Sequence, residues 1–342
     1  MKNKKSEKIY IEIDKSFIKN EIDKKIHKRL NKNENIECIL CENIKDDFIS
    51  TNKICIKKES IIFKDMTKLL EYILLKVDSR NKNQIPENDY ENILRRYKLE
   101  ALNFEKYKKI LDVGTGKGSM FLNNYNFYDV SSKHIDVVEE NKHSRETCKR
   151  LSIFNNVFST DDKIDASEYE VVTIFGVLEH VDNPYELLKK YKSAKKIFIS
   201  VPNAMSFHRM LGVELGMIDK ESDLTLGDKA IGHKIVFNKE SIEKILNLFC
   251  EKYNFEIKRS GTLGFKFTNS TKMSLYFSEK ENNKIYNIAK RTGLAGENNF
   301  TGAELYYEIE KKWLYVLRSR FCCCKYWRKD IFIWPGWNNR KL

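Results

Sequence analysis

The sequence predicts an α/β protein with a mostly parallel sheet and helices on both faces. Apolar or β-branched runs alternate with helical stretches, which is typical of parallel sheets. The first run leads straight into a glycine-rich segment. The chain of 342 residues is 41% hydrophobic, which is enough for a sizeable core. The strands expected for this sheet lie at 109–113, 135–138, 171–175 and 197–201.

Residues 1–85 are predicted to form an N-terminal α+β accessory region, for which the sequence indicates no function. Isoleucines alternate with polar residues in its first strand, and apolar residues recur at helical spacing near its end. Pro86 and several asparagines indicate the best candidate for a linker after this region. The elements expected are strands at 9–13, 54–56 and 61–63, a helix at 69–77 and a linker at 79–89.

Composition excludes some classes of protein. No apolar run approaches the roughly 20 residues that a membrane-spanning helix needs. Charged residues without a following apolar stretch begin the chain, so we expect no secretory signal and a cytoplasmic location. The net charge of +13 is only weak evidence for a nucleic-acid partner, because the whole chain is rich in Lys, Asn and Ile.

The cysteines do not form a recognisable zinc motif. Cys38 and Cys41 have zinc-ligand spacing, but no second pair follows, and Cys55 alone does not complete four ligands. We interpret these cysteines as small buried apolar residues of a reduced protein. The sequence therefore predicts no metal-binding residues.

The segment Ile110-Leu-Asp-Val-Gly-Thr-Gly-Lys-Gly118 carries the functional argument. A buried strand is followed by three glycines at alternate positions, which allows the backbone to approach a ligand closely. Asp112 precedes the first glycine, and Glu139 and Glu140 end the next strand, where an acid can accept both ribose hydroxyls of a nucleoside. These acids suit a cationic or zwitterionic nucleoside better than a pyrophosphate. A tight turn with a purely structural role is the alternative.

These residues resemble the class I S-adenosylmethionine-dependent methyltransferases. The glycine segment resembles their first motif, and Val137-Val-Glu-Glu140 resembles the strand end that holds the ribose. Phe175-Gly-Val-Leu-Glu-His-Val-Asp-Asn-Pro184 resembles the fourth-strand motif of a subgroup that includes ubiquinone-pathway O-methyltransferases. The segments 200–209, 211–216 and 232–237 follow in an order similar to that of bacterial small-molecule and glycan methyltransferases.

The resemblance implies a Rossmann-like fold with a mostly parallel seven-stranded sheet in residues 86–270. A helical extension would follow at 271–310, and a basic aromatic tail at 311–342. S-adenosylmethionine would be the cofactor, with Glu139 fitting the ribose position better than Glu140. The cofactor-binding residues implied are Asp112, Gly114, Thr115, Gly116, Gly118, Glu139, Glu140, Asp162, Gly176 and Leu178.

The candidate catalytic bases are His180, His208 and His233, because imidazole titrates near neutral pH and each lies in a matching segment. Alternatively, His180 only orients a helix and His233 only satisfies a loop carbonyl. Asn203 and Arg209 are the candidate substrate-binding residues. Arg209 would pair either with an anionic substrate or with a structural acid.

The predicted function is methyl transfer to an oxygen or nitrogen of a small-molecule, glycan or lipid-linked acceptor. The tail 311–342 has nine Lys or Arg residues, one acid and four Trp. That composition suits an anionic membrane surface, RNA, or a segment docked on the domain. An RNA or protein methyltransferase that docks through the tail, and a non-catalytic scaffold on the same fold, are the alternative functions.

Overall fold

A computed structural model describes residues 89–125 and 127–312 and parts of residues 9–73. Its N-terminal part contains a small sheet with the strand order β2-β1-β4-β3. β1 pairs in parallel with β2 and β4, whereas β3 pairs antiparallel with β4. The strands are β1 Ile9–Asp14, β2 Ile36–Cys41, β3 Phe48–Ile49 and β4 Lys53–Ile56.

Several expectations for this region can be compared with the structure. The strands at 9–13 and 54–56 are confirmed as β1 and β4. Phe63 is buried but not in a strand, and the other two residues of the expected third strand lie outside the described residues. Leu69, Tyr72 and Ile73 are helical and buried, as expected for 69–77. Most of the proposed linker, up to residue 88, lies outside the described residues.

The main sheet confirms the predicted α/β class and has the strand order β11-β10-β12-β9-β8-β5-β6-β7. Its central strands β9, β8, β5, β6 and β7 run parallel, and β12 is antiparallel to both β9 and β10. The strands are β5 Lys109–Val113, β6 His134–Val138, β7 Asn156–Phe158, β8 Val171–Phe175, β9 Lys196–Pro202, β10 Phe255–Leu263, β11 Gly296–Glu297 and β12 Glu304–Lys311.

The sheet has eight strands rather than the seven expected. The additional strand is the two-residue β11, which pairs with Gly261 and Thr262 at the outer edge of β10. The segment predicted as a helical extension, 271–310, contains two helices but ends in β12. Because β12 lies between β9 and β10, the sheet includes residues far beyond 270.

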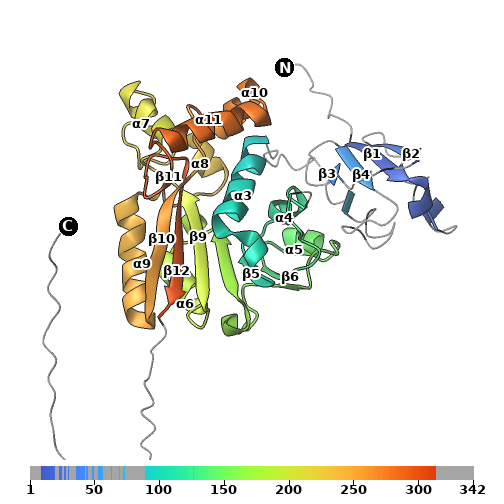
Figure 1. Cartoon of the computed structure of the whole chain (residues 1–342), viewed down its shortest axis with the longest axis horizontal. Helices are drawn as coiled ribbons and strands as arrows, with labels where there is room; N and C mark the ends of the chain where they lie inside the picture. The colour runs from blue at the N-terminus through green and yellow to red at the C-terminus, as the bar shows by residue number, and fades with distance from the viewer. Residues whose placement is uncertain are drawn as a thin grey trace, which may run out of the picture. The chain divides into compact units, whose positions relative to one another are not determined.

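Helices pack on both faces of the sheet, as predicted (Figure 1). Neighbouring residues of a buried strand contribute to different cores: Ile110 belongs to the core with α3 and α4, and Leu111 belongs to the core with α6 and α9. The helices are α3 Asp89–Leu102, α4 Ser119–Leu122, α5 Lys142–Cys148, α6 Pro184–Lys190, α7 Phe207–Glu214, α8 Leu226–Ala230, α9 Lys239–Tyr253, α10 Ser270–Tyr276 and α11 Glu279–Arg291.

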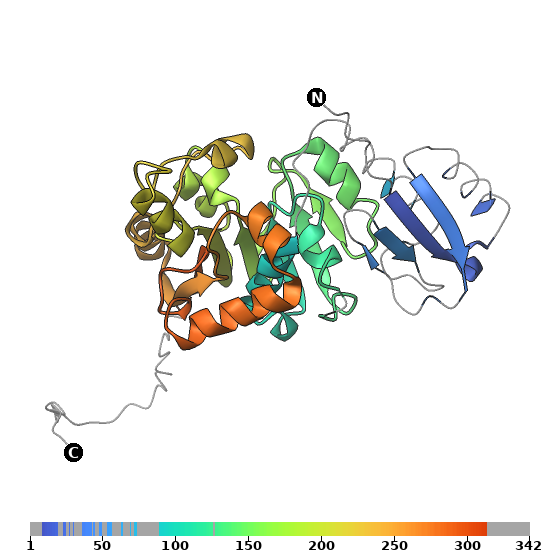
Figure 2. The same cartoon turned by 90° about the horizontal axis from the view of Figure 1, so that it is seen from above.

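Four of these helices gather at the end of the sheet where the parallel strands terminate. β9 ends at Pro202 and leads into residues 203–236, which we call the cap segment and which contain α7 and α8. Figures 1 and 2 show α10 and α11 at the same end. Ligands of open parallel sheets bind beyond the carboxyl ends of the strands, so the cap segment borders the expected site.

Among the residues that the structure describes, no helix is both long enough and apolar enough to span a membrane.

Candidate functional site

The glycine loop leaves open space at the end of β5. Gly114, Gly116 and Gly118 all have positive φ angles, of 76°, 59° and 79°, a region that glycine occupies without strain. A Cβ atom at Gly114 would lie 2.3 Å from Cγ2 of Val177, whereas a Cβ atom at Gly116 would meet nothing within 4 Å. The backbone at Gly116 is therefore accessible to a ligand.

Glu139 lies directly beside this loop, one residue beyond the end of β6. Its carboxylate accepts hydrogen bonds from the backbone N–H of Gly116 and of Asn141, each at 2.8 Å. Two backbone donors thus fix the orientation of a mostly buried acid. Its neighbour Glu140 is exposed. Asp162 is also exposed, and its carboxylate accepts a hydrogen bond from the N–H of Ser159 in a turn after β7.

Asp112 is buried within the sheet, with 2% of its surface exposed. Its partner in the β5–β8 register is Thr173, whose hydroxyl donates a hydrogen bond of 2.6 Å to the carboxylate. Burial raises the pKa of Asp112 to about 6, although the hydroxyls of Thr173 and Thr115 act in the opposite direction. This position therefore favours a nearby positive charge.

The residues that follow β8 lie at the same end of the sheet as the glycine loop. Gly176 has a φ angle of 66°, and its N–H donates to the carbonyl of Ser200. Leu178 begins a single 3-10 turn, Leu178–His180, and its side chain is fully buried in the core. This turn carries Glu179 and His180 away from the strand, toward the cap segment.

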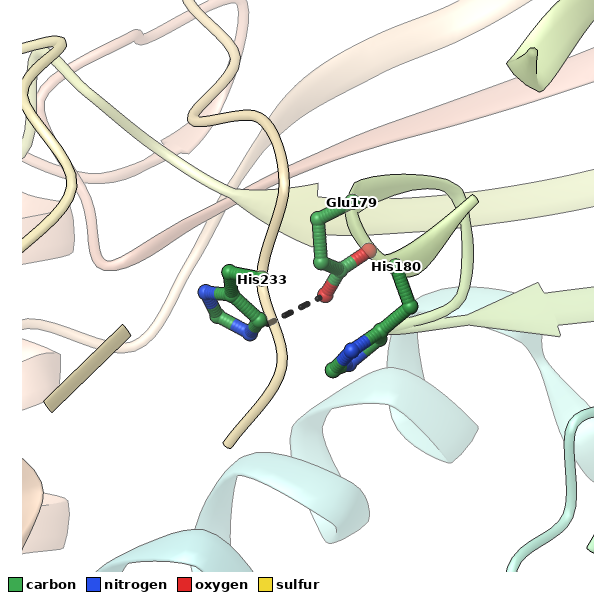
Figure 3. Close-up of side chains that lie close together, drawn as sticks. All are labelled: Glu179, His180 and His233. Atoms are coloured by element: carbon green, nitrogen blue, oxygen red, sulfur yellow. Dashed lines mark ion pairs between the residues drawn. The ribbon is translucent and has the colours of Figure 1, made fainter. Parts of the chain in front are cut away.

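Glu179, His180 and His233 come together although more than fifty residues separate the last from the others (Figure 3). Oε1 of Glu179 lies 3.9 Å from Nε2 of His233, and the two imidazole rings meet edge to face at 4.7 Å. Burial raises the pKa of Glu179 to about 7. Burial, together with the neighbouring His233, lowers the pKa of His180.

Hydrogen bonds connect this cluster to the cap segment. Nδ1 of His233 lies 3.1 Å from Oδ1 of Asp228, and Nδ1 of His180 lies 3.2 Å from the carbonyl oxygen of Gly232. The N–H of Lys234 also donates to the carbonyl of Glu179 at 2.7 Å. The cap segment therefore positions both imidazole rings.

The two predicted substrate-binding residues make hydrogen bonds within the protein. The guanidinium of Arg209 pairs with Oδ2 of Asp228 at 3.1 Å and donates to the carbonyls of Glu221 and Asp223. This geometry matches the structural ion pair considered for Arg209. The amide of Asn203 donates to the carbonyls of residues 300 and 302, each at 2.9 Å.

His208 differs from the other two candidate bases. Its Nδ1 lies 3.0 Å from the hydroxyl of Ser206 at the start of α7. Burial lowers the pKa of His208 well below its usual value, so the ring is neutral at physiological pH. Among the described residues, His180 and His233 contact each other, whereas His208 contacts Ser206, so the structure brings together two of the three histidines.

Three residues of this region were not predicted from the sequence. Thr173 and Glu179 are recognisable only once β8 is placed beside β5 and the cap segment. Asp228 did have a local signal, because Thr225 and Asp228 form a capping box at the start of α8. The capping box, however, does not indicate that the same carboxylate contacts both Arg209 and His233.

The fold and the glycine loop define a class I methyltransferase, a class that uses S-adenosylmethionine. A family profile described as "Methyltransferase domain" matches residues 85–259. The chain therefore belongs to this methyltransferase family, and the resemblance seen in the sequence is confirmed at that level. The loop fits the cofactor, since it combines open space at Gly116 with two carboxylates, those of Asp112 and Glu139. No curated protein matches the chain.

Solved structures with similar folds include several methyltransferases. One is a possible histamine N-methyltransferase from Thermotoga maritima, with 17% identity and a TM-score of 0.44, covering 70% of this chain and 99% of that chain. Another is a SAM-dependent methyltransferase from Archaeoglobus fulgidus, with 21% identity and a TM-score of 0.38, covering 70% and 99%. A third is the plantazolicin methyltransferase BpumL in complex with a pentazolic desmethylPZN analog and SAH, with 17% identity and a TM-score of 0.39, covering 70% of this chain and 90% of that chain.

Proposed function

We propose that this protein transfers a methyl group from S-adenosylmethionine to an oxygen or nitrogen of a small-molecule, glycan or lipid-linked acceptor. The observation that carries the proposal is the open loop at Gly116, with the carboxylate of Glu139 held against it at the end of a parallel sheet. A position at the point where the strand order reverses, beside β5 and β8, is where this class of sheet binds its ligand.

The acids around the loop have separate roles in this proposal. The carboxylate of Glu139 accepts one backbone hydrogen bond on each oxygen, and a carboxylate has about four lone-pair sites. Two sites therefore remain for the ribose hydroxyls. Asp112 supports the positive charge of the cofactor, because an ionised carboxylate in this buried position is stabilised by a nearby cation.

The surface of the cap segment favours an acceptor that combines apolar and anionic parts. Lys229, Ile235 and Val236 line a cavity of about 590 Å³, whose lining also includes Ser222, Asp223, Leu224 and Lys234. Lys234 pairs with Asp182 at 2.7 Å, so Lys229 is the basic group that this cavity offers to an anionic part of the acceptor. Several large apolar side chains of the same segment are exposed, and Leu226 has 87% of its surface exposed. These exposed residues are Met205, Leu215, Met217, Leu226 and Ile231. A lipid-linked acceptor with an anionic group provides both kinds of contact.

The cofactor site is tested by calorimetric titration of S-adenosylhomocysteine into the purified protein and two variants. Gly116→Asn fills the open space while keeping a residue type that tolerates a positive φ angle. Gly293→Asn is the matched control, because Gly293 also has a positive φ angle and open space around it but lies after α11. We expect binding by the unmodified protein and the control, and none by Gly116→Asn. Equal binding by all three would contradict the proposed site.

The acceptor class is tested by incubating the protein with methyl-labelled S-adenosylmethionine and a cell extract, and then separating lipid-soluble, small-molecule, RNA and protein fractions. We expect label in the lipid-soluble or small-molecule fraction. Label in RNA or protein would instead support the alternative functions predicted from the basic tail. The Gly116→Asn variant is the control, because it should leave all fractions unlabelled.

A further inference from the structure

We propose that Glu179, His180 and His233 bind a divalent transition-metal ion beside the glycine loop. One ligand atom from each of the three side chains lies within 4.8 Å of the other two. Two imidazole nitrogens and one carboxylate form a ligand set that suits ions such as Fe²⁺, Co²⁺ or Zn²⁺, and three protein ligands leave coordination positions open. The sequence did not indicate this site, because His233 is distant from the Glu-His pair along the chain.

The hydrogen bonds of His180 and His233 leave Nε2 of each ring available to bind a metal ion. A carbonyl oxygen can only accept, so Nδ1 of His180 carries the proton that faces Gly232. The carboxylate of Asp228 likewise fixes the proton of His233 on Nδ1. In both rings the lone pair is then on Nε2. A metal-binding imidazole usually donates a hydrogen bond from its other ring nitrogen to a carboxylate or a carbonyl, which fixes the orientation of the ring.

Glu179 provides a second, independent observation. Its side chain is 2% exposed, and Oε2 accepts no hydrogen bond from the residues that the structure describes. Lys98 does not neutralise it, because its ammonium pairs with Glu304 at 2.9 Å. Its other oxygen, Oε1, lies only at the long distance of 3.9 Å from Nε2 of His233. A carboxyl oxygen without a partner in the protein interior is costly. A bound cation would provide the missing partner.

The cluster of Glu179, His180 and His233 lies close to the glycine loop, where the proposed methyl transfer would take place. Val177, two residues before Glu179, packs over Gly114 of the cofactor loop, and a Cβ at Gly176 would lie 3.4 Å from Oε1 of Glu179. An acceptor hydroxyl that binds at an open metal position would lose its proton to water more readily. This role of the metal ion in methyl transfer rests on the proposed function. The oxygen then forms a bond to the methyl carbon, the carbon–sulfur bond breaks, and its electron pair remains on sulfur.

The first test uses the unmodified full-length protein and Co²⁺ as a spectroscopic probe. We expect one equivalent of Co²⁺ to bind, with visible absorption bands of a histidine-ligated ion, and Zn²⁺ to displace it. Absence of these bands at stoichiometric Co²⁺ would overturn the proposal. This measurement needs no variant, so it does not depend on how well a mutated cluster folds.

Variants assign the ligands. We expect Glu179→Gln and His233→Gln to lower the Co²⁺ affinity by more than about 100-fold. Asp228→Asn removes the charge behind His233 and also the ion pair with Arg209, and should lower the affinity by about 10- to 100-fold. His134→Gln is the control, because His134 lies at the start of β6, opposite the loop. Equal affinity in the Glu179 and His233 variants and the unmodified protein would overturn the assignment.

Binding of S-adenosylhomocysteine by the same samples separates the two proposals. Cofactor binding without Co²⁺ binding overturns the metal site and leaves the proposed function in place. Co²⁺ binding that requires Glu179 and His233, in a protein that does not bind the cofactor, supports the metal site and contradicts the proposed function. Retained cofactor binding in Glu179→Gln also shows that this variant is folded.

Discussion

At the scale of single residues, Asp112 has a less favourable environment for a charged carboxylate than Glu139, the other buried acid proposed to bind the cofactor. Glu139 receives two backbone hydrogen bonds, whereas Asp112 is buried in the sheet and accepts a hydrogen bond from Thr173. Burial raises the pKa of Asp112 to about 6. The folded protein therefore holds a proton there, between about pH 4 and 6, that the unfolded chain has lost. Stability decreases as the pH rises through this range.

This environment predicts that Asp112→Asn stabilises the protein in the absence of cofactor. At pH 7.5 we expect a gain of about 3 kcal/mol in the free energy of unfolding, from a shift of about 2 pKa units, and no gain at pH 4. The measurement is urea unfolding at both pH values, with Asp161→Asn as an exposed control. A gain that is independent of pH would show that the charge of Asp112 is not the cause. Cofactor binding by the variant should weaken.

At the scale of elements, a buried ion pair helps to hold the two helices of the cap segment together. Arg209 on α7 contacts the carbonyls of Glu221 and Asp223 and the carboxylate of Asp228 on α8. Asp228 also accepts from the hydroxyl of Thr225 at 2.7 Å. The loop between the two helices contributes few buried apolar residues, so these polar contacts hold it in place.

We therefore predict that Arg209→Met opens the cap segment without unfolding the sheet. The carbonyls of Glu221 and Asp223 lose their donor, which should cost about 1–3 kcal/mol locally. Trypsin should then cleave faster after Lys220 and Lys229, both exposed in the native protein. Arg291→Met removes an exposed arginine from α11 and should not change the cleavage rate. Equal cleavage of both variants would mean that other contacts hold the segment.

At the scale of the whole molecule, the chain divides into a unit of residues 1–312 and a unit of residues 313–342. The first unit contains the entire sheet and all the candidate site residues. The second contains seven Lys or Arg residues, one acid and all four Trp. The charge and aromatic content of the tail thus belong to a different unit from the candidate site residues.

Deletion of residues 313–342 should leave the binding of S-adenosylhomocysteine and the melting temperature unchanged. Binding to vesicles of anionic lipid should decrease strongly, because each basic residue near such a surface contributes about 1 kcal/mol. Vesicle sedimentation of the full and shortened proteins measures this, with vesicles of neutral lipid as the control. If only RNA binding is lost on deletion, the tail is an RNA-docking segment.

Local sequence patterns predicted much of the fold. Strand runs, the glycine loop and the acid after β6 are each encoded within about ten residues, because backbone geometry and burial of alternate side chains are local properties. The strand count was less predictable. The edge strand β11 has two residues, and its pairing with β10 depends on chain segments more than thirty residues apart.

The sequence by itself determined the methyltransferase class, the glycine loop and the position of Glu139, since these depend on contiguous residues. Only the tertiary structure decided which distant side chains meet. It places Thr173 against Asp112, turns Arg209 inward to Asp228, and brings His233 to Glu179 and His180. The physical reason is that the order of strands in the sheet and the return of the cap segment over their ends are long-range contacts, which no local periodicity encodes.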